Sequence, residues 1–135
     1  MIIRGTTPYH IFDIPFEFSD IQQIFITYLQ NGQVVLDKNI NDISVNEEAP
    51  LIDESLIQKL KIVFNNKNDE GVTTTIMLHL SQEDTLKFNF FPAAEKNIAV
   101  IQLRILDANN EAYASSPIYE RIYGILKEGV ISINE

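Results

Sequence analysis

Apolar residues recur at every second position in several stretches of this chain, the period that sends alternate side chains to opposite faces of a β-strand. The clearest case is residues 72–80, where Ile76, Leu78 and Leu80 point one way and the residues between them point the other. Residues 98–106 repeat the pattern, with Ile101 and Leu103 on one face. Such segments are typical of half-buried antiparallel strands.

The dipeptide Asn31-Gly32 separates two β-rich runs, QQIFITYLQ and QVVLDKN. Asn-Gly favours the type I′ turn, whose twist matches that of the flanking strands, so this segment predicts a hairpin. Its first arm is apolar on both faces, and a strand of this kind needs a cover on each side. We expect the second cover to be the chain's own loops or a neighbouring subunit. The two faces carry Ile24, Ile26 and Tyr28 and, opposite them, Phe25, Thr27 and Leu29.

Four other segments have β character. Residues 9–16 indicate a first strand, and residues 40–45 a short one. The stretch 56–64 fits a helical turn in its first part and a strand in its second, and we favour the strand. Residues 112–123 are expected to form a second hairpin with the strand that ends near residue 106.

Residues 81–91 carry a turn signal and then three phenylalanines. A Ser81 hydroxyl followed by carboxylates is typical of a helix start, so a brief helical turn is expected here. Phe88, Phe90 and Phe91 are then expected to plug the core together.

These segments amount to seven or eight strands with one or two short helical turns and no long helix. Two sheets that each have one apolar face bury those faces against each other, which favours an all-β fold, an antiparallel β-sandwich. A small closed barrel is the alternative. The sandwich is immunoglobulin-like in architecture only, since the chain has no cysteine pair and no tryptophan. A length of 135 residues fits a single domain over residues 1–135.

The net charge and the composition argue against several classes of function. Ten Lys and Arg against nineteen Asp and Glu leave a net charge of −9, which repels phosphate backbones and anionic membranes, so neither nucleic acid nor a membrane is an expected partner. There is no cysteine for a disulfide or a thiolate metal site. No apolar run matches a signal peptide or a membrane span, so we expect cytoplasmic synthesis.

The residues offer no catalytic constellation. His10 and His79 lie on separate predicted strands without an evident third ligand, and we expect surface or partly packed imidazoles. No G-x-S-x-G motif and no glycine cluster occurs. Acidic pairs occur at Glu47-Glu48, Asp69-Glu70 and Glu83-Asp84. Residues 68–70 could form a weak calcium site, but solvated loop charge is the favoured interpretation. The prediction is therefore no enzyme, no cofactor and no metal.

Tyrosines gather late in the chain, with Tyr113, Tyr119 and Tyr123 within eleven residues. In a strand, Tyr119, Arg121 and Tyr123 share one face. An exposed Tyr-Arg-Tyr row suits a protein interface or a sugar platform, whereas buried tyrosines would be core packing. Tyr113, Tyr119, Arg121 and Tyr123 are the candidate interface.

Several segments together resemble a family of small proteins encoded by phages and prophages of Gram-positive gut bacteria. They are MIIRGTTP at the start, FITYLQNGQVVLDKN in the hairpin, LSQEDTLKF, and IQLRILDANNEAYASSPIYERIYGILKEGVI at the end. The resemblance covers nearly the whole chain and implies a virion-associated β-sandwich, encoded near tail or baseplate genes, without a catalytic motif. The chain departs from the family by an extra stretch at about 47–69, which is either a decoration or an additional strand.

The leading hypothesis is therefore a non-enzymatic structural or protein-interaction module of a phage particle or prophage remnant. Its partners would be other phage structural proteins or copies of itself, in a homo-oligomer, and its location the virion. The alternative is a carbohydrate-binding module that stacks sugars on the exposed tyrosines. The tail at 125–135 is expected to be either a docking strand or a frayed end.

Overall fold

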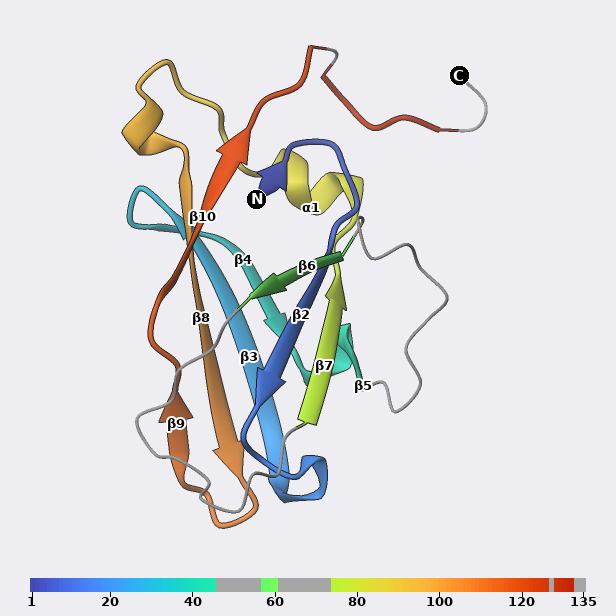
Figure 1. Ribbon diagram of the computed structural model, residues 1–135, viewed down its shortest axis with the longest axis vertical. Helices are drawn as coiled ribbons and strands as arrows, with labels where there is room; N and C mark the ends of the chain where they lie inside the picture. Colours follow the sequence, from blue (N-terminus) through green and yellow to red (C-terminus); the bar gives the residue numbers. More distant parts are fainter. Residues whose placement is uncertain (46–56, 61–73, 127, 133–135) are drawn as a thin grey trace.

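A computed structural model of the chain describes residues 1–45, 57–60, 74–126 and 128–132 (Figure 1). These residues form an all-β, sandwich-like fold of two sheets, as the alternation predicts. The larger sheet holds six strands: β1 (Ile2–Ile3), β3 (Ile21–Gln30), β4 (Gln33–Asn39), β8 (Ile98–Asp107), β9 (Ala112–Ala114) and β10 (Ile118–Tyr123). The smaller sheet holds four: β2 (Tyr9–Ile14), β5 (Ile43–Val45), β6 (Ile57–Leu60) and β7 (Thr74–His79).

The strand order resembles the immunoglobulin arrangement except at β6, which lies beside β2 although it follows β5 in the chain. The larger sheet runs β1-β10-β8-β3-β4, with β9 paired to β8, and the smaller runs β5-β7-β2-β6. In chain order, β3, β8 and β10 occupy the places of strands C, F and G, and β4 that of C′. β2, β7 and β5 take the places of B, E and D. Figure 1 shows the smaller sheet in front of the larger one.

Two edge pairs differ from the expected antiparallel pattern. β1 pairs with β10, and β2 pairs with β6, in parallel, whereas the other pairs are antiparallel. A parallel pair cannot be closed by a tight turn, and these partners are indeed far apart in the chain. The described strands also number ten rather than seven or eight, because short strands such as β1 add to a sheet edge and the expected strand at 112–123 is divided. Pro117, which has no N–H to donate, lies in the gap between β9 and β10.

The core lies between the two sheets, and strand alternation builds it as expected. On β3 the side chains of Ile24, Ile26 and Tyr28 are completely buried, and on β8 so are Ile101 and Leu103. β7 contributes Ile76 and Leu78, and β2 contributes Phe12 and Ile14. Burial of this kind stabilises by roughly 1.5–3 kcal/mol per large apolar side chain.

The first hairpin has the predicted turn. Asn31 and Gly32 both take positive φ, +52° and +78°, which is the type I′ geometry that joins β3 to β4. A register shift lies between Tyr28 and Leu29, where β4 carries one extra residue.

The helical segments are short. Among the described residues they are α1 (Gln82–Leu86) and the 3-10 turns η1 (Phe18–Asp20), η2 (Ile40–Asp42) and η4 (Ala94–Lys96). Ser81 caps α1 as predicted, in a capping box with Asp84. The expected plug of three phenylalanines is wrong, because Phe88 alone is buried while Phe91 is half-buried and Phe90 is exposed. The segment after α1 is not a strand, so alternation does not turn Phe90 inward.

Most of the expected insertion at about 47–69 lies outside the described residues. Within it, residues 57–60 form β6, in agreement with the strand favoured for 56–64. Residues 40–45 are a 3-10 turn followed by β5. Within the described part of the chain, no helix has the length and apolar character needed to cross a membrane.

Candidate functional site

The outer face of the larger sheet carries an apolar row that crosses four strands. Tyr119 on β10 lies opposite Val100 on β8, and Val100 lies opposite Leu29 on β3. Leu29 in turn pairs with Val34 on β4. We call these four residues the outer row. Tyr119 and Val34, at its two ends, are 67% and 62% exposed, and the two middle residues are half-buried.

Polar residues border the outer row on one side. The next row on this face lies two residues along β3 from Leu29. It consists of Gln102 on β8, Thr27 on β3 and Asp37 on β4, which lie side by side. The Thr27 hydroxyl donates to Asp37 Oδ1 over 3.3 Å. One step further lies Phe25, 40% exposed and flanked by Arg104 and Asn39. The face therefore carries apolar and polar rows in turn, and its apolar row extends from β10 to β4.

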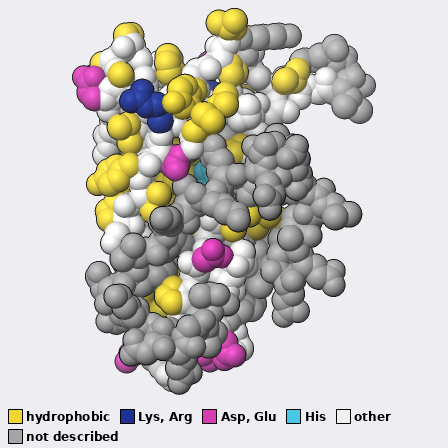
Figure 2. All heavy atoms as spheres, viewed as in Figure 1, with side chains coloured by type: hydrophobic (Ala, Val, Ile, Leu, Met, Phe, Trp, Pro, Cys, Tyr) yellow, Lys and Arg dark blue, Asp and Glu magenta, His cyan; other side chains and the backbone are white. Residues whose placement is uncertain are grey.

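Three of the four candidate interface residues lie together on this face. Tyr119, Arg121 and Tyr123 are all exposed on the outer side of β10, as the alternation predicts. They do not pack in the core, because Ile122, one residue out of phase, fills that place. Figure 2 shows the opposite side of the molecule, where the smaller sheet lies in front, and on that side hydrophobic side chains gather where β10 passes into the C-terminal segment.

Tyr113 does not belong to that group. It lies on β9 opposite Ile105, a core residue, so its ring turns inward and packs against Phe16 with the ring centroids 4.9 Å apart. Its hydroxyl donates to Glu111 Oε2 over 3.0 Å and approaches Asp107 Oδ2 at 3.3 Å. The hydrogen bond to Glu111, followed by desolvation and the nearby carboxylates, raises the pKa of Tyr113 to about 12.

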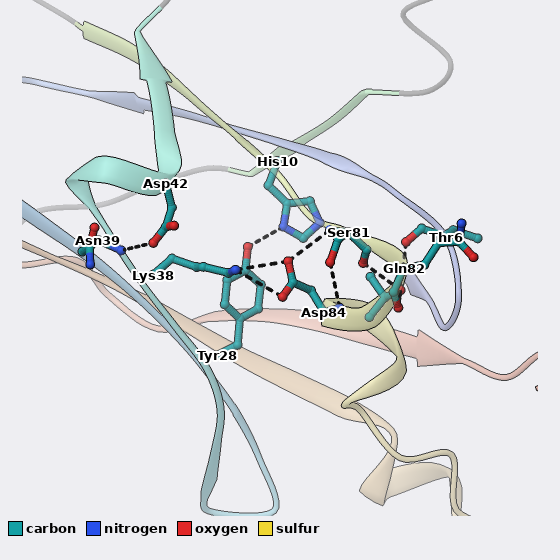
Figure 3. A network of polar contacts seen from close by, with 10 residues as sticks. Thr6, His10, Tyr28, Lys38, Asn39, Asp42, Ser81, Gln82 and Asp84 are labelled. Atoms are coloured by element: carbon teal, nitrogen blue, oxygen red, sulfur yellow. Dashed lines mark hydrogen bonds and ion pairs between the residues drawn. The ribbon is translucent and has the colours of Figure 1, made fainter. Parts of the chain in front are cut away.

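A second polar feature lies inside the sandwich, where Figure 3 shows His10 and Tyr28 pointing toward each other. His10 Nδ1 and Tyr28 Oη are 2.6 Å apart, and both side chains are completely buried. The expectation of a surface or partly packed His10 is therefore wrong. His10 has the same strand parity as Phe12 and Ile14, so alternation turns it into the core, and Tyr28 supplies a polar partner there. Burial, and then the charges of Asp84 and Glu120, raise the pKa of the Tyr28 hydroxyl well above its ordinary value.

Beside this pair, Lys38 of β4 meets Asp84 of α1. Lys38 Nζ lies 3.1 Å from both carboxylate oxygens of Asp84, which also accepts the Ser81 backbone N–H (Figure 3). Partial burial opposes ionisation of Asp84, but the Ser81 N–H and the Lys38 ammonium outweigh it and lower the pKa of the carboxyl. These contacts fasten α1 to the sandwich.

The buried pair has no route to a substrate, since His10 and Tyr28 have no exposed surface. The other histidine, His79, stacks on Tyr9 with ring centroids 3.9 Å apart on the outside of the smaller sheet. Among the described residues, no group of three or more His, Cys, Asp or Glu side chains is placed to hold a metal ion. Of the expected acidic pairs, Glu83-Asp84 opens α1, and the other two lie outside the described residues.

The C-terminal segment after β10 leaves the sandwich and runs across its end, past α1 (Figure 1). Its described residues are not in a strand. The Gln82 side chain donates to the Ile131 carbonyl over 2.9 Å and accepts the Ile131 N–H over 2.7 Å, and Arg4 pairs with Glu128. Leu126, between the end of β10 and the first of these contacts, is completely exposed. The described part of the expected tail is thus held to its own chain at two places.

Comparisons of the chain with protein-family models, with curated proteins and with solved structures found no match. The arrangement of the described side chains therefore carries the functional argument.

Proposed function

We propose that this protein is a non-enzymatic structural component of a phage particle or prophage remnant that works through protein contacts. Its contact surface is the outer face of the larger sheet, and its nearest partner is a second copy of the chain. The phage setting rests on the resemblance of the sequence segments named above. The choice of the contact surface rests on the position and exposure of the outer row.

The observation that carries the proposal is that the outer face of the larger sheet exposes apolar side chains while its inner face is buried. The inward side chains of β3 are completely buried, whereas Phe25 on its outer side, Val34 on β4 and Tyr119 on β10 are 40%, 62% and 67% exposed. We propose that a neighbouring subunit, one of the two covers expected from the sequence, lies over this face.

Charge favours a second copy at this face. The protein carries a net charge of −9, so two copies repel each other over most orientations. The outward residues of β3, β4, β8 and β10 include Arg104 and Arg121 and one acidic side chain, Asp37. Repulsion is therefore weakest here.

The size of the face is also adequate. β3 and β8 are ten residues long, about 33 Å at roughly 3.3 Å per residue. The four strands of the outer row, spaced about 4.8 Å apart, give a width of about 19 Å. Because β4 and β10 are shorter than β3 and β8, the area is at most about 600 Å² per copy, near the lower end of the range for specific interfaces.

Sedimentation equilibrium of the wild type and of Tyr119→Lys tests the surface. We expect the wild type to rise with concentration from the 15.4 kDa monomer toward twice that mass. A lysine at the end of the outer row should weaken association at least tenfold without changing the unfolding midpoint, because residue 119 is exposed in the monomer. Leu126→Lys is the matched control, an exposed apolar residue outside the sheet, and it should associate like the wild type.

Two outcomes contradict the contact surface. One is a wild type that stays monomeric at every concentration. The other is an assembly that Leu126→Lys dissociates and Tyr119→Lys does not, which would move the contact to the C-terminal segment. The particle assignment has a separate test, mass spectrometry of purified particles induced from the host. It fails if capsid and tail proteins are detected and this chain is not.

A carbohydrate-binding module is the second candidate, favoured by one observation. Tyr119 and Tyr123 are 67% and 42% exposed on the same face of β10, where rings can stack on sugars. A glycan array separates the two functions. Reproducible binding that Tyr119→Ala abolishes favours the sugar platform, and a silent array together with concentration-dependent mass favours protein contact.

A further inference from the structure

A pocket of about 540 Å³ lies between the tip of the first hairpin and the loop that follows α1. Its size falls within the range of small-molecule sites. The hairpin contributes Asn31 and Gln33, and the loop contributes Lys87, Asn89, Phe91 and Lys96. It is separate from the tyrosines of β10.

Side-chain amides hold the walls of this pocket in place. Gln30 Nε2 donates to the Asn89 carbonyl over 2.7 Å and to the Lys96 carbonyl over 3.0 Å, while its Oε1 accepts the Asn89 N–H over 2.8 Å. Asn97 does the same for Phe91, accepting its N–H over 2.7 Å and donating to its carbonyl over 2.8 Å. Both amides are buried, so the loop is tied to the sheet before any ligand arrives. A pre-organised site of this kind avoids the entropy cost of ordering a loop upon binding.

The charge of the pocket is opposite to that of the protein. Lys87 and Lys96 both line it, and no acidic side chain does so within the described part of the chain. The ion pairs found among the described residues use Lys38, Arg4 and the N-terminal amine, and neither of these two lysines. Lys96 Nζ lies 5.8 Å from the centre of the Phe91 ring. Two ammonium groups that share a pocket without a carboxylate favour an anionic ligand.

The uncharged lining narrows the ligand class. Asn31, Gln33 and Asn89 offer amide donors and acceptors suited to hydroxyl groups. Phe91 offers an aromatic surface for the apolar face of a ring. We propose that this pocket binds a saccharide that carries a carboxylate or a phosphate group, with the lysines on the anion. This site goes beyond the protein-contact function, and it adjoins the outer row, since Val34 also lines the pocket.

Titrations of the ¹⁵N-labelled full chain with four probes test the proposal: glucuronate, glucose 6-phosphate, glucose and inorganic phosphate. We expect amide shifts at Asn89 and Lys96 with at least one charged sugar, and at least tenfold weaker binding of glucose and of phosphate. Comparison of the two charged sugars shows whether the pocket prefers a carboxylate or a phosphate. The double variant Lys87→Gln, Lys96→Gln should lose at least tenfold in affinity with an unchanged unfolding midpoint, because both side chains are exposed.

Arg104→Gln, which removes an exposed cation farther along β8, is the control for net charge when compared with Lys96→Gln alone, and it should bind like the wild type. Tyr119→Ala should also bind like the wild type. The proposal is overturned if neither charged sugar shifts these amides, or if glucose or phosphate alone binds as tightly. It is also overturned if the lysine variant retains the affinity of the wild type.

Discussion

The two faces of β3 have similar composition and opposite surroundings. Ile24, Ile26 and Tyr28 point into the sandwich and are completely buried. Phe25, one residue out of phase with them, is 40% exposed on the other side. Packing within a single chain accounts for the apolar residues on the inner face of β3, but it does not account for Phe25 on the outer face. Apolar character by itself therefore does not distinguish a core from a contact surface, and the distinction comes from what lies above each face.

The largest effect on the free energy of unfolding is expected from a substitution on the inner face of β3, and a substitution on its outer face is the comparison. Ile26→Ala removes a fully buried side chain and should lower the free energy of unfolding by about 2–5 kcal/mol. Phe25→Ala, next to it in sequence, should cost less, about 1–2 kcal/mol in the monomer, since its side chain is 40% exposed. Urea unfolding at low protein concentration measures both. Equal losses would show that the outer face is also packed within one chain.

The second-largest effect on stability is expected from loss of the buried Tyr28 hydroxyl. Tyr28→Phe keeps the ring and removes the oxygen that His10 Nδ1 meets at 2.6 Å. A buried polar group that loses its hydrogen bond costs about 1–3 kcal/mol. We expect a loss in this range by urea unfolding, while association measured by sedimentation stays unchanged. A neutral Tyr28→Phe would mean that the pair contributes nothing to stability.

The ion pair at α1 should give a pH-dependent contribution of about 1–2 kcal/mol. The pKa of Asp84 is lowered from its ordinary value of 3.8, so its ionised form stabilises the fold above that pH. This contribution is lost as the pH falls through the lowered folded-state pKa. Asp84→Asn should therefore destabilise at pH 7 and reduce the slope of stability against pH below about 4. Parallel wild-type and variant curves in that window would contradict the role of the carboxylate.

The smallest effect on stability should come from the outer row. Tyr119→Lys is expected to change the free energy of unfolding by less than about 0.5 kcal/mol, because residue 119 is exposed in the monomer. Thermal unfolding at low concentration measures it. A loss above 2 kcal/mol would place Tyr119 among the residues that hold the single chain together.

Local rules were sufficient where one residue type decides the backbone or where alternation is clean. Asn31-Gly32 determines the turn because both residues tolerate positive φ, and the period of two places Ile76 and Leu103 in the core. The same period applies to His10, which shares the parity of Phe12, so the sequence contained the signal for its burial. The partner Tyr28 could have been found in the same way.

Other features depend on pairings that no local pattern specifies. The outer row exists because β10, β8, β3 and β4 meet in one particular register, and these strands are up to about ninety residues apart. The parallel pairs of β1 with β10 and of β2 with β6 likewise join distant segments. Tyr113 separates from the other tyrosines because β9 is a strand of its own, paired opposite Ile105.

Thiol labelling tests the central claim most directly, because the chain has no cysteine and each variant therefore carries one reactive group. Val100→Cys places a thiol in the middle of the outer row, and Ser44→Cys places one on exposed β5 of the smaller sheet. If a second copy closes the outer face, labelling of Val100→Cys should slow as the protein concentration rises, while labelling of Ser44→Cys stays constant. Labelling of Val100→Cys at the same rate in monomer and assembly would contradict the account.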